Sequence, residues 1–171
     1  MAPQPKAAGK GCELDKYIGR DVGLEVAFAC GDVDPRTINF MPIGALRAKE
    51  FSLEWDTVDA TADDNKGNTR SNLATYKTFS CSGDGTCKKK DDTQSNQTAL
   101  FMHVNDPQGT SGQPVAWIRI TCPDITVYAF CIITSIGRTM PFDELATFNF
   151  EATATDSPFG VIVEKTPEVG G

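Results

Sequence analysis

Six cysteines and a single histidine, His103, are the side chains in this chain that could act as nucleophiles, general bases or soft metal ligands. A structural zinc site needs Cys or Cys/His pairs at short spacing, and the sequence contains no C-x-x-C pair. A lone histidine on a short helix is more often structural or solvated than catalytic. We therefore expect no metal site and no catalytic histidine.

The number of cysteines is even, which in a secreted domain would indicate disulfides. The N-terminal stretch Met1–Lys10 lacks the apolar core of a signal peptide. Cys131 stands in an apolar stretch, where a free cysteine behaves as a small hydrophobic residue. We therefore predict free thiols at all six positions, which are Cys12, Cys30, Cys81, Cys87, Cys122 and Cys131.

Two charged stretches are the remaining candidates for binding chemistry. The acidic stretch 59–67 does not match a calcium-binding EF-hand loop, because its sixth position is not glycine and Ser71, not an acidic residue, falls near its end. Lys88–Lys90 lie beside two aspartates, a pattern typical of a solvated turn. The motifs of P-loop, dinucleotide-binding, zinc-protease and serine-hydrolase sites do not occur. The sequence thus predicts a protein that is not an enzyme and needs no cofactor.

The composition narrows the class of protein further. A chain of 171 residues suits a single domain. Its formal charge of −7 repels phosphate groups, so tight binding of nucleic acid across the surface is not expected. The longest apolar run, Ile125–Ile133, is far shorter than the ~20 residues of a membrane helix. We expect one domain without a membrane span.

Alternation of apolar and polar residues predicts β-strands along most of the chain. Asp21–Phe28 places its larger apolar side chains on one face, and Glu50–Asp56 and Leu145–Thr155 each have one apolar and one polar face. Ile125–Ile136 is apolar on both faces, so we expect it to be buried on both sides. Further strands are expected at Thr75–Ser82, Val115–Thr121 and Val161–Glu164, with a turn at Ser82–Gly85.

The predicted fold class is all-β, an antiparallel β-sandwich or flattened barrel with one flanking α-helix. The helix is expected over Thr93–Val104, with Asp92 or Thr93 as its N-cap. Residues 1–18 are rich in Ala, Gly, Pro and Lys and are expected to form a flexible arm, and 166–171 a short tail. Residues 57–73 form a long polar loop, a length that usually serves a function such as contact between subunits.

Four segments in this order resemble one known family. They are the Pro42–Arg47 segment, the Phe51–Thr57 strand leading into the polar loop, the Phe79–Gly85 segment and the strand Asp143–Glu151. Their order and spacing resemble the major tail tube protein of long-tailed, non-contractile bacteriophages of the siphovirus type. The resemblance covers about Gly19–Lys165, and the six cysteines depart from the family's pattern.

The resemblance implies a structural virion protein whose copies join edge to edge into hexameric rings. The rings stack through the long loop and the terminal arms into a tail tube, assembled in the host cytoplasm, that conducts DNA into the host cell. Its partners would be further copies of itself and the tail tip, tape-measure and tail terminator proteins. DNA would pass through the lumen without specific binding.

Two of the predicted strands, Glu50–Asp56 and Leu145–Thr155, have polar faces without lysine or arginine, which suits the lining of such a passage. Six copies of a −7 chain would give a ring of −42, and a negative bore repels DNA and lets it slide. Alternation alone leaves open whether these faces meet a lumen or the outer solvent. We expect the lumen residues to be Glu50, Glu54, Asp56 and Glu151, and the residues that contact the next ring to be Asp63, Asp64, Lys66 and Arg70.

Three other readings remain at this stage. The fold would also suit the inner tube of a contractile tail or of a type VI-like secretion system, because fold alone does not separate these assemblies. A secreted immunoglobulin-like binding module would have three disulfides in place of six thiols. A small β-barrel carrier would be a stable monomer with an internal apolar pocket.

Overall fold

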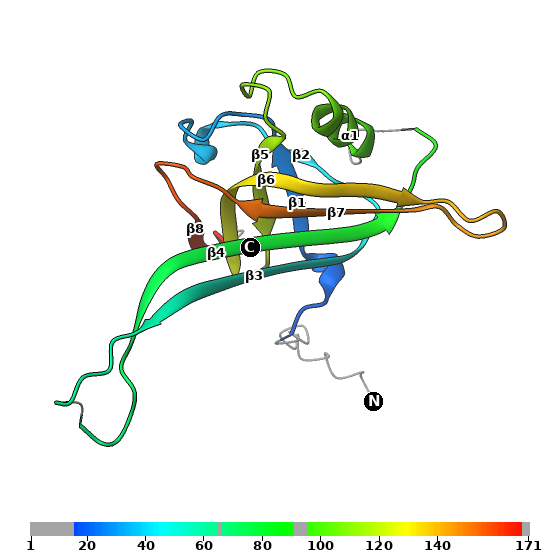
Figure 1. The fold of residues 1–171 in the computed structure, drawn as a ribbon. Coiled ribbons are helices and arrows are strands. Elements are labelled where there is room, and N and C mark those ends of the chain that lie inside the picture. The colour runs from blue at the N-terminus through cyan, green and yellow to red at the C-terminus, as the bar shows by residue number, and fades with distance from the viewer. Residues whose placement is uncertain (1–15, 65, 91–95, 169–171) are drawn as a thin grey trace, which may run out of the picture.

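The computed structural model describes residues 16–64, 66–90 and 96–168, which form one antiparallel sheet and one α-helix (Figure 1). The strand order is β2-β1-β5-β6-β7-β4-β3, and β8 pairs with β6. The strands are β1 Gly23–Ala27, β2 Met41–Pro42, β3 Leu46–Asp59, β4 Asn72–Thr86, β5 Val115–Thr121, β6 Ile125–Thr139, β7 Thr147–Ala154 and β8 Ile162–Lys165. The helix α1 is Gln97–Asn105, and two 3-10 turns are η1 Gly19–Asp21 and η2 Pro35–Thr37. The predicted all-β class with one helix is confirmed.

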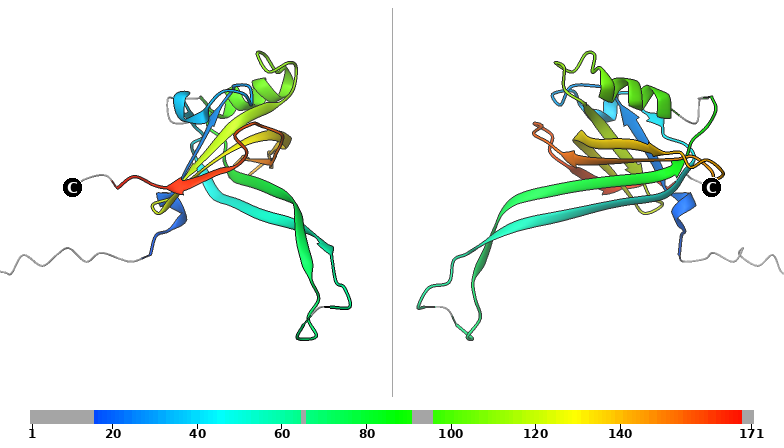
Figure 2. Two further views of the ribbon diagram at one scale, coloured as in Figure 1. Left: turned by 90° about the vertical axis from the view of Figure 1, so that its left-hand side faces the viewer. Right: turned by 45° about the vertical axis from the view of Figure 1, so that its right-hand side comes forward.

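Strand β6 joins two halves of the sheet. Its first part, 125–132, pairs with β5 and β8, and its last part, 131–139, pairs with β7. We call β2, β1, β5, β8 and β6 125–132 the short half-sheet. We call β6 133–139, β7, β4 and β3 the long half-sheet. The two halves cross at a steep angle in Figure 2 and pack face to face, as in a sandwich.

The core lies between the two half-sheets. One apolar cluster takes Leu24, Val26 and Ile118 from the short half-sheet, and Phe79 and Phe148 from the long one. A second cluster covers the other face of the short half-sheet and consists of Ala27, Trp117, Tyr128 and Phe130. The short half-sheet is therefore buried on both faces. The two-sided burial predicted for Ile125–Ile136 is confirmed for 126–131, whereas Thr134 and Ser135, in the part of β6 that belongs to the long half-sheet, are exposed.

The turn predicted at Ser82–Gly85 is wrong, because β4 runs on as a strand to Thr86. The glycines serve close packing instead of a reversal of the chain. A Cβ atom on Gly83 would lie 2.8 Å from the Phe150 ring, and one on Gly85 would collide with the Ala45 carbonyl. A side chain at Gly85 would therefore collide with the backbone, whereas one at Gly83 would force the Phe150 ring to shift.

The long polar loop is shorter than the predicted 57–73, because β3 continues to Asp59 and β4 begins at Asn72. The far ends of β3 and β4 form a hairpin that projects from the body, which we call the β3–β4 arm, residues 55–77 (Figure 1). The arm leaves the flat part of the sheet at a register shift between Trp55 and Thr57. It exposes large apolar side chains, namely Trp55, Val58, Leu73 and Tyr76.

Helix α1 begins at Gln97, later than the predicted Thr93, and the predicted N-caps lie outside the described residues. The side-chain amide of Gln97 donates hydrogen bonds to the Gly44 and Thr86 carbonyls. These bonds tie the start of the helix to the segment before β3 and to the end of β4. His103 is buried, stacks on Phe28 and has its Nε2 atom 2.9 Å from the Val115 carbonyl. The histidine is structural. Among the described residues, no helix is both long and apolar enough for a membrane span.

Candidate functional site

The outward face of the long half-sheet, turned away from the core, gathers most of the predicted site residues. Glu50 on β3 pairs with Ser82 on β4, and Ser82 pairs with Glu151 on β7. The two carboxylates therefore stand in one row, on either side of a serine, although their residues are far apart in the sequence. The neighbouring row is Ser52, Ser80 and Thr153.

Acidic and hydroxyl side chains make up this face. Ser52 and Ser80 join their hydroxyls across the strands at 3.0 Å, and both line a shallow depression of about 230 Å3. The acidic residues on the face of these described strands are Glu50, Glu54, Asp84 and Glu151. Such a surface repels phosphate groups.

Two of the four cations on the strands of the long half-sheet, Lys49 and Arg138, lie on its core side. The Lys49 ammonium reaches to the core side, where it donates hydrogen bonds to the Gly19 and Val22 carbonyls at 3.1 and 2.6 Å. Arg138 stacks over the Phe101 ring of α1 with its guanidinium carbon 4.7 Å from the ring centroid. Lys49 and Arg138 are therefore directed away from the acidic face. The other two cations of these strands are Arg47, at the register shift between Leu46 and Ala48, and Lys77, which lies over the Trp55 ring in the β3–β4 arm.

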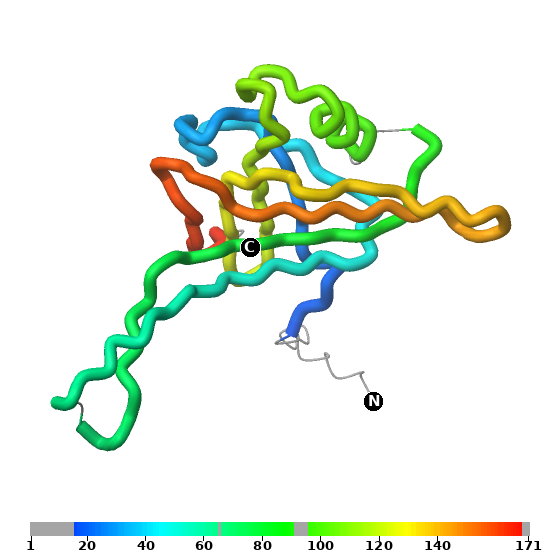
Figure 3. The backbone as a smooth tube through the Cα atoms, viewed as in Figure 1, coloured from blue at the N-terminus to red at the C-terminus, as the bar shows by residue number. Residues whose placement is uncertain are grey.

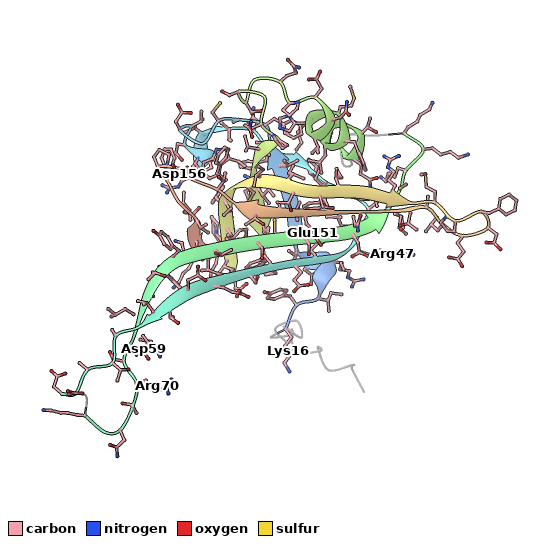
Figure 4. All side chains as sticks on the ribbon, viewed as in Figure 1. Lys16, Arg47, Asp59, Arg70, Glu151 and Asp156 are labelled. Carbon is pink, nitrogen blue, oxygen red and sulfur yellow. The ribbon has the colours of Figure 1, made fainter. Side chains whose placement is uncertain are left out.

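Three of the four expected lumen residues lie on the outward face of the long half-sheet, and the fourth lies at its border. Glu50 and Glu151 share a row, and Glu54 lies on the same face nearer the β3–β4 arm. Asp56 stands at the register shift where the arm begins, so it is separate from the flat face. Figure 4 labels Glu151 in the middle of the sheet and Arg47 near the end at which β3 begins.

Asp84 belongs to the acidic face and was missed by the sequence analysis. It pairs with Ala48 on β3 and Asn149 on β7, next to the Glu50 row. The interpretation of Ser82–Gly85 as a turn removed it from the strand. Continuing the period-2 alternation of β4 through both glycines would have found it.

The four expected ring-stacking residues lie together in the tip of the β3–β4 arm, and all are exposed. The base of the tip is closed by hydrogen bonds, from the Ala60 amide to the Ser71 carbonyl and from the Ser71 amide to the Thr61 hydroxyl. Hydrogen bonds from the Thr61 hydroxyl and amide lower the pKa of Asp59. The tip residues are Asp63, Asp64, Lys66 and Arg70.

The long half-sheet has two free edges among the described residues. Strand β3 pairs only with β4, and β6 pairs only with β7 beyond Ile133. Long unpaired edges are templates for pairing with another chain. Both edges border the acidic face.

The cysteines add no chemistry to this face. The five within the described residues are free thiols, as predicted, and Cys12 lies outside them. Cys81 and Cys131 are core residues, and the hydrogen bond to Cys81 together with burial raises the pKa of Cys131. The described His, Cys, Asp and Glu side chains form no cluster that could hold a metal ion.

Comparison with known proteins identifies the fold. No family model matches the chain, and no curated protein matches it. It is similar to the tail of an empty gene transfer agent particle, with a TM-score of 0.63 and 22% identity, over 89% of this chain and 100% of that one. It is similar to the SPP1 tail tube, with a TM-score of 0.59 and 13% identity, over 90% of this chain and 81% of that one.

A third similar structure comes from a contractile system. It is the sheath–tube complex of an extracellular contractile injection system, with a TM-score of 0.58 and 13% identity, over 89% of this chain and 93% of that one. Identities this low show the fold alone. The chain therefore has the fold shared by the tubes of these tails and injection systems.

Proposed function

We propose that this chain is the structural subunit of a phage tail tube, built from stacked hexameric rings that conduct DNA into the host cell. One observation carries the proposal. Among the residues that the structure describes, the flat part of the long half-sheet has an acidic face without cations, bordered by two unpaired edges, which is what a strand-lined passage for DNA needs from each copy.

The strand directions support closure of a ring. Successive strands of the long half-sheet, β6, β7, β4 and β3, are antiparallel, so β3 runs opposite to β6. Rotation about a ring axis keeps the axial direction of every strand. The β3 edge of one copy would therefore meet the β6 edge of the next copy in antiparallel pairing, and a head-to-tail contact that closes removes all such edges.

In this arrangement the acidic face lines the bore. Glu50, Glu54, Asp84 and Glu151 would present only negative charge to the DNA phosphates, so the polymer slides and does not bind. Asp56 would stand where the lining passes into the arm. No catalytic group is required of such a wall, and we assign the chain a structural role without an enzymatic step.

The β3–β4 arm would connect one ring with the next. It projects from the sheet, carries exposed apolar side chains along its strands and has Asp63, Asp64, Lys66 and Arg70 at its tip. Apolar strands with a charged tip are suited to a contact that has a dry centre and a polar rim. The remaining partners would be the tail tip, tape-measure and tail terminator proteins, within the tail of the virion.

Electron microscopy of the purified protein tests the proposal directly. Hollow cylinders or six-fold rings are expected at high protein concentration. A particle that stays monomeric at every concentration would contradict it. Because contractile systems share this fold, the absence or presence of a sheath around tubes from virions would separate the non-contractile from the contractile assembly.

A further inference from the structure

The turn between β6 and β7, residues 140–146, forms an apolar knob that the proposed ring does not yet explain. Phe142 is 106% exposed, so it contacts almost nothing in its own chain, and Met140 is 71% exposed. Pro141 between them restricts the backbone and limits the conformations of the knob. Asp143 and Glu144 follow directly and give the turn a negative charge. Exposed apolar groups gathered in this way mark an interaction site.

A groove of about 270 Å3 lies beside the free edge of β3. Its walls are the N-terminal segment around Tyr17 and Val22 and the start of β3, and Ile120 and Cys122 supply further apolar surface. Partial desolvation and the neighbouring Cys122 and Asp124 raise the pKa of Tyr17, in agreement with its place against this wall.

The groove has a mainly positive rim. Arg47 and Lys49 both line it, and Lys49 is held there by its hydrogen bonds to the Gly19 and Val22 carbonyls. Glu50 is the acidic side chain of the lining, and it belongs to the outward face of β3. The knob is apolar with acidic neighbours, and the groove is apolar with basic neighbours. The two surfaces are complementary in both respects.

We propose that the β6–β7 turn of one copy seats in this groove of the next copy in the same ring, with Phe142 in the apolar part and Asp143 and Glu144 facing Arg47. This inference rests on the proposed function, because it assumes the pairing of β3 with the neighbouring β6. The β6–β7 turn lies past the end of the sheet at which β3 begins, opposite the β3–β4 arm (Figure 3). Pairing along the seam therefore brings the neighbour's turn to the end of β3 where the groove opens.

The first experiment compares Phe142→Ala with Met102→Ala. Met102 is 67% exposed on α1, so the two variants remove similar exposed apolar groups from different surfaces. Sedimentation over a range of concentrations gives the concentration at which half the protein is assembled. We expect a roughly tenfold to hundredfold increase for Phe142→Ala and none for Met102→Ala, with unchanged thermal midpoints for both. If Phe142→Ala assembled at the same concentration as the wild type, the proposed contact would be wrong, and the proposed tail-tube function would be unaffected. Failure of the wild type to assemble would overturn both.

A charge exchange tests the pairing itself. Arg47→Glu and Asp143→Arg should each weaken assembly several-fold, because each places like charges across the contact. The double variant restores opposite charges and should assemble at a concentration close to that of the wild type. A double variant weaker than either single variant would overturn the proposed orientation of the turn in the groove.

Discussion

The two half-sheets share β6 but differ in how complete they are within one copy. The short half-sheet is covered on both faces, by the main core on one side and by the cluster around Trp117 on the other. Within the described part of the chain, the long half-sheet is covered on one face only, has two free edges and ends in two projecting hairpins. We infer that the short half-sheet stabilises the fold of each copy, whereas the long half-sheet is completed only by other copies.

The two tryptophans offer the largest test of this comparison. Trp117 is fully buried, contacts the Phe130 ring in a tilted arrangement and donates a hydrogen bond to the Cys30 carbonyl at 3.1 Å. We expect Trp117→Ala to lower the free energy of unfolding by about 3 to 5 kcal/mol in urea titrations of the monomer.

Trp55, on the β3–β4 arm, is the matched control, because it is 55% exposed. Trp55→Ala should change the free energy of unfolding of the monomer by less than about 0.5 kcal/mol and yet impair the stacking of rings seen by electron microscopy. Equal losses of monomer stability in both variants would contradict the division of roles between the half-sheets.

A smaller loss of stability is expected within the long half-sheet, on its core side. Gly85→Ala forces a methyl group against the Ala45 carbonyl, which belongs to the backbone and cannot move aside easily. We expect a loss of about 1 to 3 kcal/mol, measured by thermal or urea unfolding. Gly137→Ala is the control, because its nearest contact is a side-chain atom at 3.4 Å. Similar stabilities for the two variants would show that the close approach at Gly85 has little effect on stability.

Reversing the charge of the acidic face should change how tubes retain DNA and leave the free energy of unfolding nearly unchanged. In the double variant Glu50→Lys and Glu151→Lys, the exposed row becomes basic, and the free energy of unfolding should change by less than about 1 kcal/mol. Assembled tubes of this variant should retain DNA in a salt-dependent manner, whereas wild-type tubes should not. Filter binding at several salt concentrations measures the difference. Equal retention by the two tubes would place these residues outside the bore.

The smallest expected effect concerns pH at the tip of the arm. The pKa of Asp59 is lowered in the folded chain by its hydrogen bonds with Thr61. The stability that ionised Asp59 contributes to the folded arm is therefore fully present above the ordinary pKa of 3.8. It is lost as the pH falls through the lower pKa of the folded chain. Amide exchange at Thr61 and Ser71 should accelerate below that pH in the wild type. In Asp59→Asn, amide exchange at these two residues should not accelerate at low pH. An acceleration of equal size in this variant would mean that another group, and not Asp59, causes it.

Much of the fold could be predicted from alternation alone. The strict period of two in Leu145–Thr155 predicts β7 with Phe148 and Phe150 inward, as observed. The turn at Ser82–Gly85 was predicted wrongly because glycine is equally compatible with a reversal and with close packing inside a strand. Only the Phe150 ring and the Ala45 carbonyl, which come from distant parts of the chain, distinguish the two cases.

Alternation along the chain is enough to predict where most of the strands lie, which of their faces are apolar and that the polar faces of two strands lack cations. These properties are local, because the period of two places neighbouring side chains on opposite sides of a strand. The fold alone shows that Glu50 and Glu151 share a row, that Asp84 lies on the same face in the next row and that Lys49 reaches the other side of the sheet. Strand order, register and bulges set these relations, and they depend on pairing between segments distant in the sequence.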